Sequence, residues 1–146
     1  MALNTVAAGR AWLYSHNIGR GGAAGMGFSA PIGVAPAKDG VLFVANRGSD
    51  TNPNQRISKI TVDHQFIMEF GSAGAAYAMT DAATIAEPGK FVWITGVALD
   101  QDENVYVTDE WLNRVTVFDK DGNLLDRKST RLNSSHIQKS RMPSSA

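Results

Sequence analysis

The chain has 146 residues, with 14 basic and 14 acidic side chains, a formal net charge of zero and no cysteine. This length suits a domain with a buried core, and the absence of cysteine excludes disulfides and thiolate metal sites. No run of about 20 apolar residues and no basic-then-apolar leader is visible, so we expect no membrane span and a cytoplasmic protein.

The neutral total hides two segments of opposite charge. Residues 1–125 carry nine basic and thirteen acidic side chains, a net charge of −4, and all twelve aromatic residues. Residues 126–146 carry five basic side chains and one acidic, a net charge of +4, with six serines and no apolar period. This tail is expected to be disordered, and over 126–136 and 140–146 it resembles a translated short-read sequencing adapter. We therefore place the domain in 1–125 and interpret 126–146 as an artefactual tail.

Residues 1–125 contain an internal repeat. The segment 28–46 aligns with 91–109 at an offset of 63, and after a loop five residues longer in the first copy, Arg56 aligns with Arg114. Short runs rich in Val, Ile, Phe and Tyr, bounded by Gly, Asn, Asp or Pro, predict four strands in each copy. The predicted strands cover about 32–36, 41–46, 56–62 and 65–70 in the first copy, and 94–99, 104–109, 113–119 and 123 onward in the second.

The turns and the apolar pattern indicate how these strands are arranged. Asp39-Gly40 and residues 121–123 have hairpin-turn chemistry, because Gly and Asn tolerate positive φ. The strands at 41–46 and 104–109 contain runs that are apolar on both faces, which favours a sheet between neighbouring sheets. Four-stranded antiparallel units that recur along a chain are typical of propeller blades. We expect an all-β partial propeller with blades over about 28–71 and 91–125.

The two copies resemble the NHL repeats of six-bladed β-propellers, with Ile94 and Asn46 departing from the usual Pro and Asp. Residues 12–19 are similar to 66–71, which implies an N-terminal outer strand. Because about two blades cannot close a ring, the resemblance implies a truncated fragment, and we expect the isolated chain to aggregate. The resemblance is carried by Phe28, Pro31, Gly33, Val34 and Ala35 in the first copy, and by Gly96, Val97, Ala98, Asp109, Asn113, Arg114, Val117 and Phe118 in the second.

Antiparallel blades place the long loops on one face, and we expect any binding site there. Those loops are 20–27, 47–55, 72–90 and 109–112. In the alternative interpretation, these residues are structural: Asp109 caps a turn and pairs with Arg114, and Trp111 packs between blades. The NHL pattern favours this interpretation, because its Asp and Arg recur from blade to blade. The candidate ligand-binding residues are Asn46, Arg47, Asp109, Glu110, Trp111 and Arg114.

No motif in the sequence indicates a catalytic, metal or cofactor site. Residues 100–104 begin like a calcium-binding loop, but Val105 and Trp111 stand where an EF-hand needs Gly and Glu. His16 and His64 have no second ligand at metal-binding spacing. We therefore predict a solvated turn at 100–104 and assign no catalytic residue, no metal and no cofactor.

Two functional interpretations stay open. The first is a propeller fragment that binds a protein or small-molecule ligand on the long-loop face. The second is a fragment of a propeller enzyme, because the resemblance extends to metal-dependent amidating lyases and lactonase-like hydrolases, whose sites would need the missing blades. Nucleic-acid binding is disfavoured by the net charge of −4 over residues 1–125.

Overall fold

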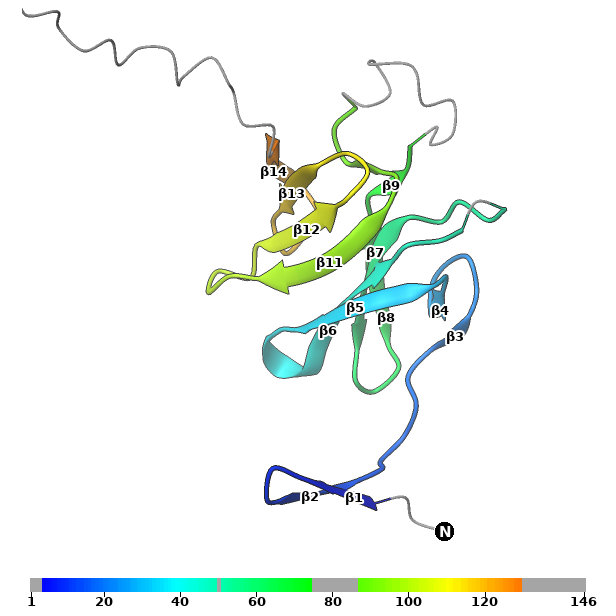
Figure 1. The fold of residues 1–146 in the computed structure, drawn as a ribbon, viewed down its shortest axis with the longest axis vertical. Helices are drawn as coiled ribbons and strands as arrows, with labels where there is room; N and C mark the ends of the chain where they lie inside the picture. Colours follow the sequence, from blue (N-terminus) through cyan, green and yellow to red (C-terminus); the bar gives the residue numbers. More distant parts are fainter. Residues whose placement is uncertain (1–3, 50, 75–86, 130–146) are drawn as a thin grey trace, which may run out of the picture.

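The structure is a computed structural model that describes residues 4–49, 51–74 and 87–129 (Figure 1). Its body consists of two four-stranded antiparallel sheets, as predicted, in which each strand pairs with the next one along the chain. The first sheet comprises β5 (Pro31–Pro36), β6 (Val41–Asn46), β7 (Arg56–Thr61) and β8 (Phe66–Phe70), and the second comprises β11 (Ile94–Leu99), β12 (Val105–Asp109), β13 (Arg114–Phe118) and β14 (Leu124–Ser129).

The bounds predicted for the strands of the two sheets lie within one residue of those observed. Strand β14 continues to Ser129, four residues past the domain boundary expected at 125, and pairs with β13 as far as Arg114. The rest of the predicted tail, 130–146, lies outside the described residues. The predicted hairpin turns are confirmed, since Asp39, Gly40 and Gly122 all have positive φ, at 54°, 71° and 80°.

The two sheets repeat each other in detail, including their irregularities. In both sheets the second and third strands pair so that Asn46 lies opposite Arg56 and Asp109 lies opposite Arg114. The sequence alignment is therefore a structural equivalence, with an offset of 63 up to the long loop and 58 after it. The register shifts also coincide: Pro31/Gly33 in β5 with Ile94/Gly96 in β11, and Lys59/Ile60 in β7 with Val117/Phe118 in β13.

The hydrophobic core lies between the two sheets, where β5 and β11 run side by side (Figure 1). The backbones approach closely at Gly33, because a Cβ atom there would lie 3.5 Å from Cγ1 of Val97. The ring of Phe118 lies 5.0 Å from that of Phe70 and 6.0 Å from that of Phe91, measured between centroids. The buried core residues are Ala35, Phe43, Ala45, Ile57 and Phe70 from the first sheet side, and Phe91, Ile94, Val105, Val107 and Phe118 from the second.

Polar contacts between the two sheets lie at the edge of this interface, on the side of the short turns. The backbone N–H of Lys38 donates to Oε1 of Glu103 over 2.8 Å. Nζ of Lys59 donates to the carbonyl of Lys120 over 2.6 Å and lies 3.8 Å from Oδ1 of Asp121. The two sheets are therefore joined by an apolar core with a polar rim.

The N-terminal strand differs from the prediction. Strand β2 covers only Arg10–Leu13 and pairs with β1 (Asn4–Ala7) in a separate hairpin, so no outer strand forms over 12–19. In the turn, Ala8 and Gly9 have positive φ, at 51° and 73°. An alanine in a sequence does not predict a turn of this kind, which usually has Gly, Asn or Asp at that position. Figure 1 shows this hairpin below the two sheets, joined to them by a single extended segment.

Short elements connect the hairpin and the two sheets. Strand β3 (Arg20–Gly21) pairs in parallel with β4 (Gly27–Phe28), and β9 (Ser72–Ala73) pairs in parallel with β10 (Lys90–Phe91). A single 3-10 turn, η1 (Lys38–Gly40), lies between β5 and β6. Within the described ranges, no helix is long and apolar enough to cross a membrane.

Candidate functional site

The long-loop face is built on a polar frame that begins with Asp109 at the end of β12. Its side chain is 2% exposed, yet it is hydrogen-bonded on both oxygens. Oδ2 accepts the backbone N–H groups of Val92 and Trp93 at 2.7 and 3.1 Å, and Oδ1 accepts that of Leu112 at 2.9 Å. The carboxylate therefore fixes both the segment entering β11 and the turn that follows β12.

Asn46 takes the equivalent place in the first sheet and is completely buried. Its Oδ1 accepts the backbone N–H of Ser29 at 2.9 Å, which corresponds to the bond between Val92 and Asp109. Its amide nitrogen also donates to Oγ of Ser58 over 3.0 Å. An ionised aspartate has no donor and cannot make this last bond.

The two arginines at the start of the third strands complete the frame. Arg56 and Arg114 are 5% and 6% exposed. Nη2 of Arg56 donates to the carbonyl of Gly27 over 2.7 Å, and Nη2 of Arg114 donates to that of Lys90, its repeat equivalent. Both arginines thus hold the backbone just before the first strand of their own sheet.

Three of the six candidate residues, Asn46, Asp109 and Arg114, therefore lie in this buried frame. Their hydrogen bonds to backbone groups agree with the alternative in which Asp109 caps the turn. Trp111 differs from that alternative, because it is 52% exposed and does not pack between the sheets. The accessible part of the candidate site is formed by Arg47, Glu110 and Trp111.

Arg47 and Glu110 occupy equivalent positions directly after β6 and β12. Their backbone N–H groups donate to the carbonyls of Ala30 and Trp93 at 3.1 and 3.0 Å, and these acceptors are also repeat equivalents. The same backbone geometry thus presents a cation in one copy and a carboxylate in the other. The guanidinium carbon of Arg47 lies 4.7 Å from the ring centroid of Trp93, a cation–π contact between the two sheets.

A groove of about 430 Å³ opens beside this contact and is lined by Trp93, Glu110, Trp111 and Asn113. Asn113 has a positive φ of 47°, and its backbone N–H donates to the carbonyl of Glu110 over 3.2 Å. This tight turn presents Trp111 and Glu110 next to each other. The groove therefore offers two indole rings and one carboxylate, with a guanidinium stacked on one of the rings.

Sequence reasoning did not identify Trp93 as a site residue. It lies directly before β11, and its contact with Arg47 joins positions 46 residues apart in different sheets. The available signal was the repeat, which aligns Trp93 with Ala30. The carbonyl of each of these two residues accepts the backbone N–H of the residue that follows the second strand of its sheet. The loop 72–90, also expected on this face, has residues 75–86 outside the described part of the chain.

The acidic segment at 100–104 forms the solvated turn that we predicted. Oδ1 of Asp100 accepts the backbone N–H groups of Asp102 and Asn104, both at 2.9 Å, and Oδ2 accepts the side chains of Asn104 and Tyr106. The hydrogen bond from the Asn104 side chain lowers the pKa of Asp100. Asp119 accepts from the backbone N–H groups of Asp121 and Asn123 and from the Asn123 side chain, and this side-chain hydrogen bond lowers the pKa of Asp119.

The structure brings together no cluster of three His, Asp or Glu side chains that could ligate a metal, as far as its described residues extend. The long-loop face thus carries an aromatic groove, with charged groups at its edge, next to the ends of the strands. No protein-family model and no curated protein matches this chain.

Proposed function

We propose that the two sheets are neighbouring blades of an NHL-type β-propeller, and that the protein is a scaffold binding a ligand on the long-loop face. The groove between Trp93 and Trp111 carries this proposal. The blade assignment is supported by the repeated polar frame and by the packing of β5 against β11, which joins two similar sheets face to face.

The groove favours a ligand that combines an apolar surface with a basic group. Trp111 is half exposed, and an indole is a large apolar surface that loses little conformational entropy on binding. Glu110 is exposed beside it and supplies the negative charge that would pair with the basic group. A peptide segment with an aromatic or aliphatic residue next to lysine or arginine has this chemistry.

A displayed library of random peptides tests the proposal directly. Peptides selected on the full chain should be rich in such apolar–basic pairs, and their affinities can be measured by fluorescence anisotropy. Aromatic hot spots contribute about 2 kcal/mol or more, so Trp111→Ala should raise Kd by roughly 30-fold. Glu110→Arg should weaken binding by reversing the charge at the groove edge.

Trp12 provides the matched control, because it is 54% exposed and lies in the N-terminal hairpin, away from the groove. Trp12→Ala should leave Kd unchanged. If the selected peptides bind Trp111→Ala and Glu110→Arg as tightly as the unaltered chain, the groove is not the binding site. A selection that enriches no peptide would also contradict the proposal.

A further inference from the structure

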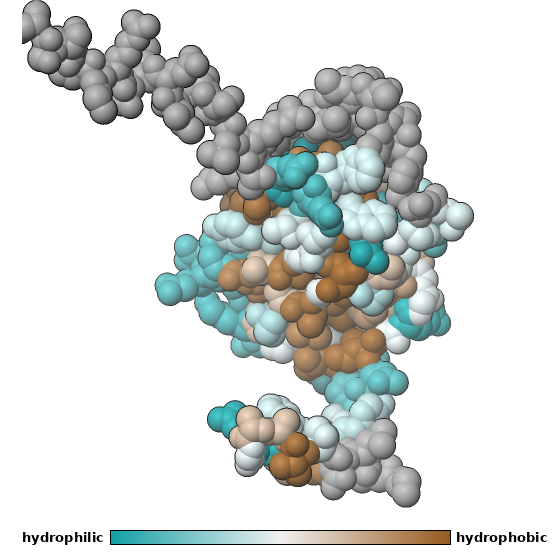
Figure 2. Space-filling model, in the orientation of Figure 1, coloured by the Kyte–Doolittle hydropathy of each residue, from teal (hydrophilic) through white to brown (hydrophobic). Residues whose placement is uncertain are grey.

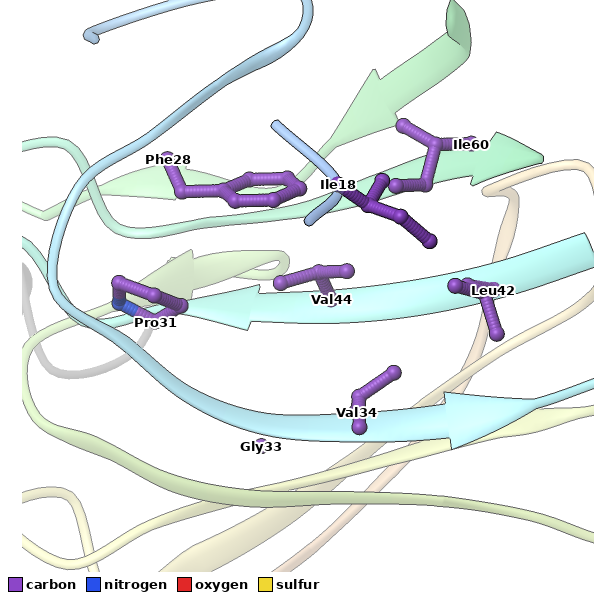
Figure 3. Close-up of a pocket in the computed structure, with 8 residues that line it drawn as sticks. All are labelled: Ile18, Phe28, Pro31, Gly33, Val34, Leu42, Val44 and Ile60. Atoms are coloured by element: carbon purple, nitrogen blue, oxygen red, sulfur yellow. The ribbon is translucent and has the colours of Figure 1, made fainter. Parts of the chain in front are cut away.

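The outer face of the first sheet, turned away from the core, carries an apolar groove of about 360 Å³. In Figure 3, Val34 projects from β5 and Leu42 and Val44 from β6, while Phe28 and Ile18 lie over β6 near Ile60. Val34 is 59% exposed and Pro31 is also exposed, so the groove is covered only in part. Figure 2 shows apolar side chains gathered across the middle of the visible face of the two sheets.

The repeat shows which surface packs against the second-sheet equivalent of this groove. Six groove residues, Phe28, Pro31, Val34, Leu42, Val44 and Ile60, are equivalent in order to Phe91, Ile94, Val97, Val105, Val107 and Phe118. These second-sheet residues form the side that packs against the first sheet in the core. The groove is therefore the same docking surface as the one buried within the chain, carried one repeat earlier.

The surface that the first sheet contributes to that interface also has a repeat equivalent, on the second sheet. The side of the first sheet that enters the core is represented by Ala35, Phe43, Ala45 and Ile57. Its repeat equivalents are Ala98, Tyr106, Thr108 and Val115, which lie on the outer face of the second sheet. Tyr106 is 36% exposed, and Ala98 and Thr108 are exposed as well.

We propose that the chain associates head to tail with a second copy of itself. The groove on the first sheet of one copy receives the outer face of the second sheet of another, in the geometry that already joins the two sheets within one chain. In the internal interface, Val97 packs against Gly33. In the interface between copies, Val34 takes the place of Val97, and Gly96 takes that of Gly33.

This interface is weaker than the internal one. The rim contacts of the internal interface are not reproduced, because Gly40 stands at the position of Glu103 and Val117 at that of Lys59. Association is therefore expected to depend on protein concentration. Because the two surfaces differ, each copy keeps one free surface after pairing, and assembly continues until it closes into a ring or extends as a chain.

Sedimentation of two complementary variants of the full chain tests this arrangement. The unaltered chain should show a mass that rises with concentration over a roughly hundredfold range. Val34→Arg blocks only the groove, and Tyr106→Arg blocks only the opposite surface, so each variant alone should be a monomer. An equal mixture of the two should form dimers and nothing larger, because only one intact pair of surfaces remains.

The alternatives give different results. If the groove pairs with its own copy, Tyr106→Arg still associates and the proposal fails. If the unaltered chain stays monomeric, or if the mixture stays monomeric, the head-to-tail interface does not exist. Val6→Arg, at a residue 77% exposed in the N-terminal hairpin, should associate like the unaltered chain, and a loss there would assign assembly to the hairpin. Circular dichroism spectra establish that each variant keeps its strands.

Discussion

Replacing Asp109 tests whether the polar frame of the long-loop face is structural. Its carboxylate accepts three backbone N–H groups, and one of them belongs to Val92, which is 5% exposed. Hydrogen bonds to a charged acceptor contribute about 1.5–3 kcal/mol each, and a buried donor left unpaired costs a similar amount. Trp93 and Leu112 are only half-buried, so we expect water to replace part of what their N–H groups lose, and Asp109→Ala to lower the free energy of unfolding by about 3–5 kcal/mol.

Asp109→Asn isolates the acceptor chemistry from the loss of volume. The asparagine side chain has an NH₂ group where the aspartate has a second oxygen. This NH₂ group would face a backbone N–H and cannot accept from it, so at least one of the three hydrogen bonds is lost. We expect a loss of about 1–3 kcal/mol for this variant. Because small domains are stable by only about 5–15 kcal/mol, both changes should be large on the scale of the whole fold.

Urea unfolding followed by circular dichroism measures both effects. With a slope of about 1–3 kcal/mol per molar urea, Asp109→Ala should lower the midpoint by about 2 M. Glu110→Ala is the matched control, because this neighbouring carboxylate is exposed and its loss should change stability by less than about 0.5 kcal/mol. If Asp109→Ala is no more destabilising than Glu110→Ala, the frame does not hold the loops and Asp109 returns to the candidate ligand-binding residues.

Two further predictions concern the turns. The hydrogen bond from Asn104 lowers the pKa of Asp100, so the carboxylate stabilises the fold above pH ~4 and this contribution is lost as the pH falls through the lowered pKa. Asp100→Asn should therefore lose less melting temperature on acidification than the unaltered chain, and identical pH profiles would contradict this. Gly71→Ala should destabilise the fold by more than about 2 kcal/mol, because φ is +72° and the new Cβ would lie 2.4 Å from Cε2 of Phe91. Gly25→Ala, with φ +58° and no atom within 4 Å of the new Cβ, should cost only about 1 kcal/mol in denaturant unfolding, and equal losses at both glycines would refute the steric argument.

The sequence predicted the two sheets well because the determinants of a meander are local. Runs of β-branched and aromatic residues set the strands, and Asp39-Gly40 and Gly122 supply the positive φ that the hairpins need. The N-terminal hairpin was not predicted, because Ala8 adopts a positive φ that its side chain disfavours. The two strands of the hairpin pair only with each other, so no repeat in the sequence marks them.

The candidate site was only partly accessible to sequence reasoning. The sequence predicted where each strand ends, so Arg47, Glu110 and Trp111, which follow a strand, were placed on the long-loop face. The burial of Asn46 and Asp109 was not, because it depends on backbone N–H groups 17 residues earlier in the chain. The contact between Arg47 and Trp93 depends on how two sheets pack, which no local pattern encodes.

At the equivalent positions of Arg47 and Glu110, the backbone hydrogen bonds of the loop face do not depend on the charge of the side chain. Each residue is fixed through its backbone N–H, which donates to a carbonyl whatever side chain the position carries. Mutations at 47 and 110 can therefore change the charge of the long-loop face while these backbone hydrogen bonds persist, and a mutation at 47 removes in addition the contact of Arg47 with Trp93. Such positions give a repeat protein a route to new binding preferences that leaves its fold intact.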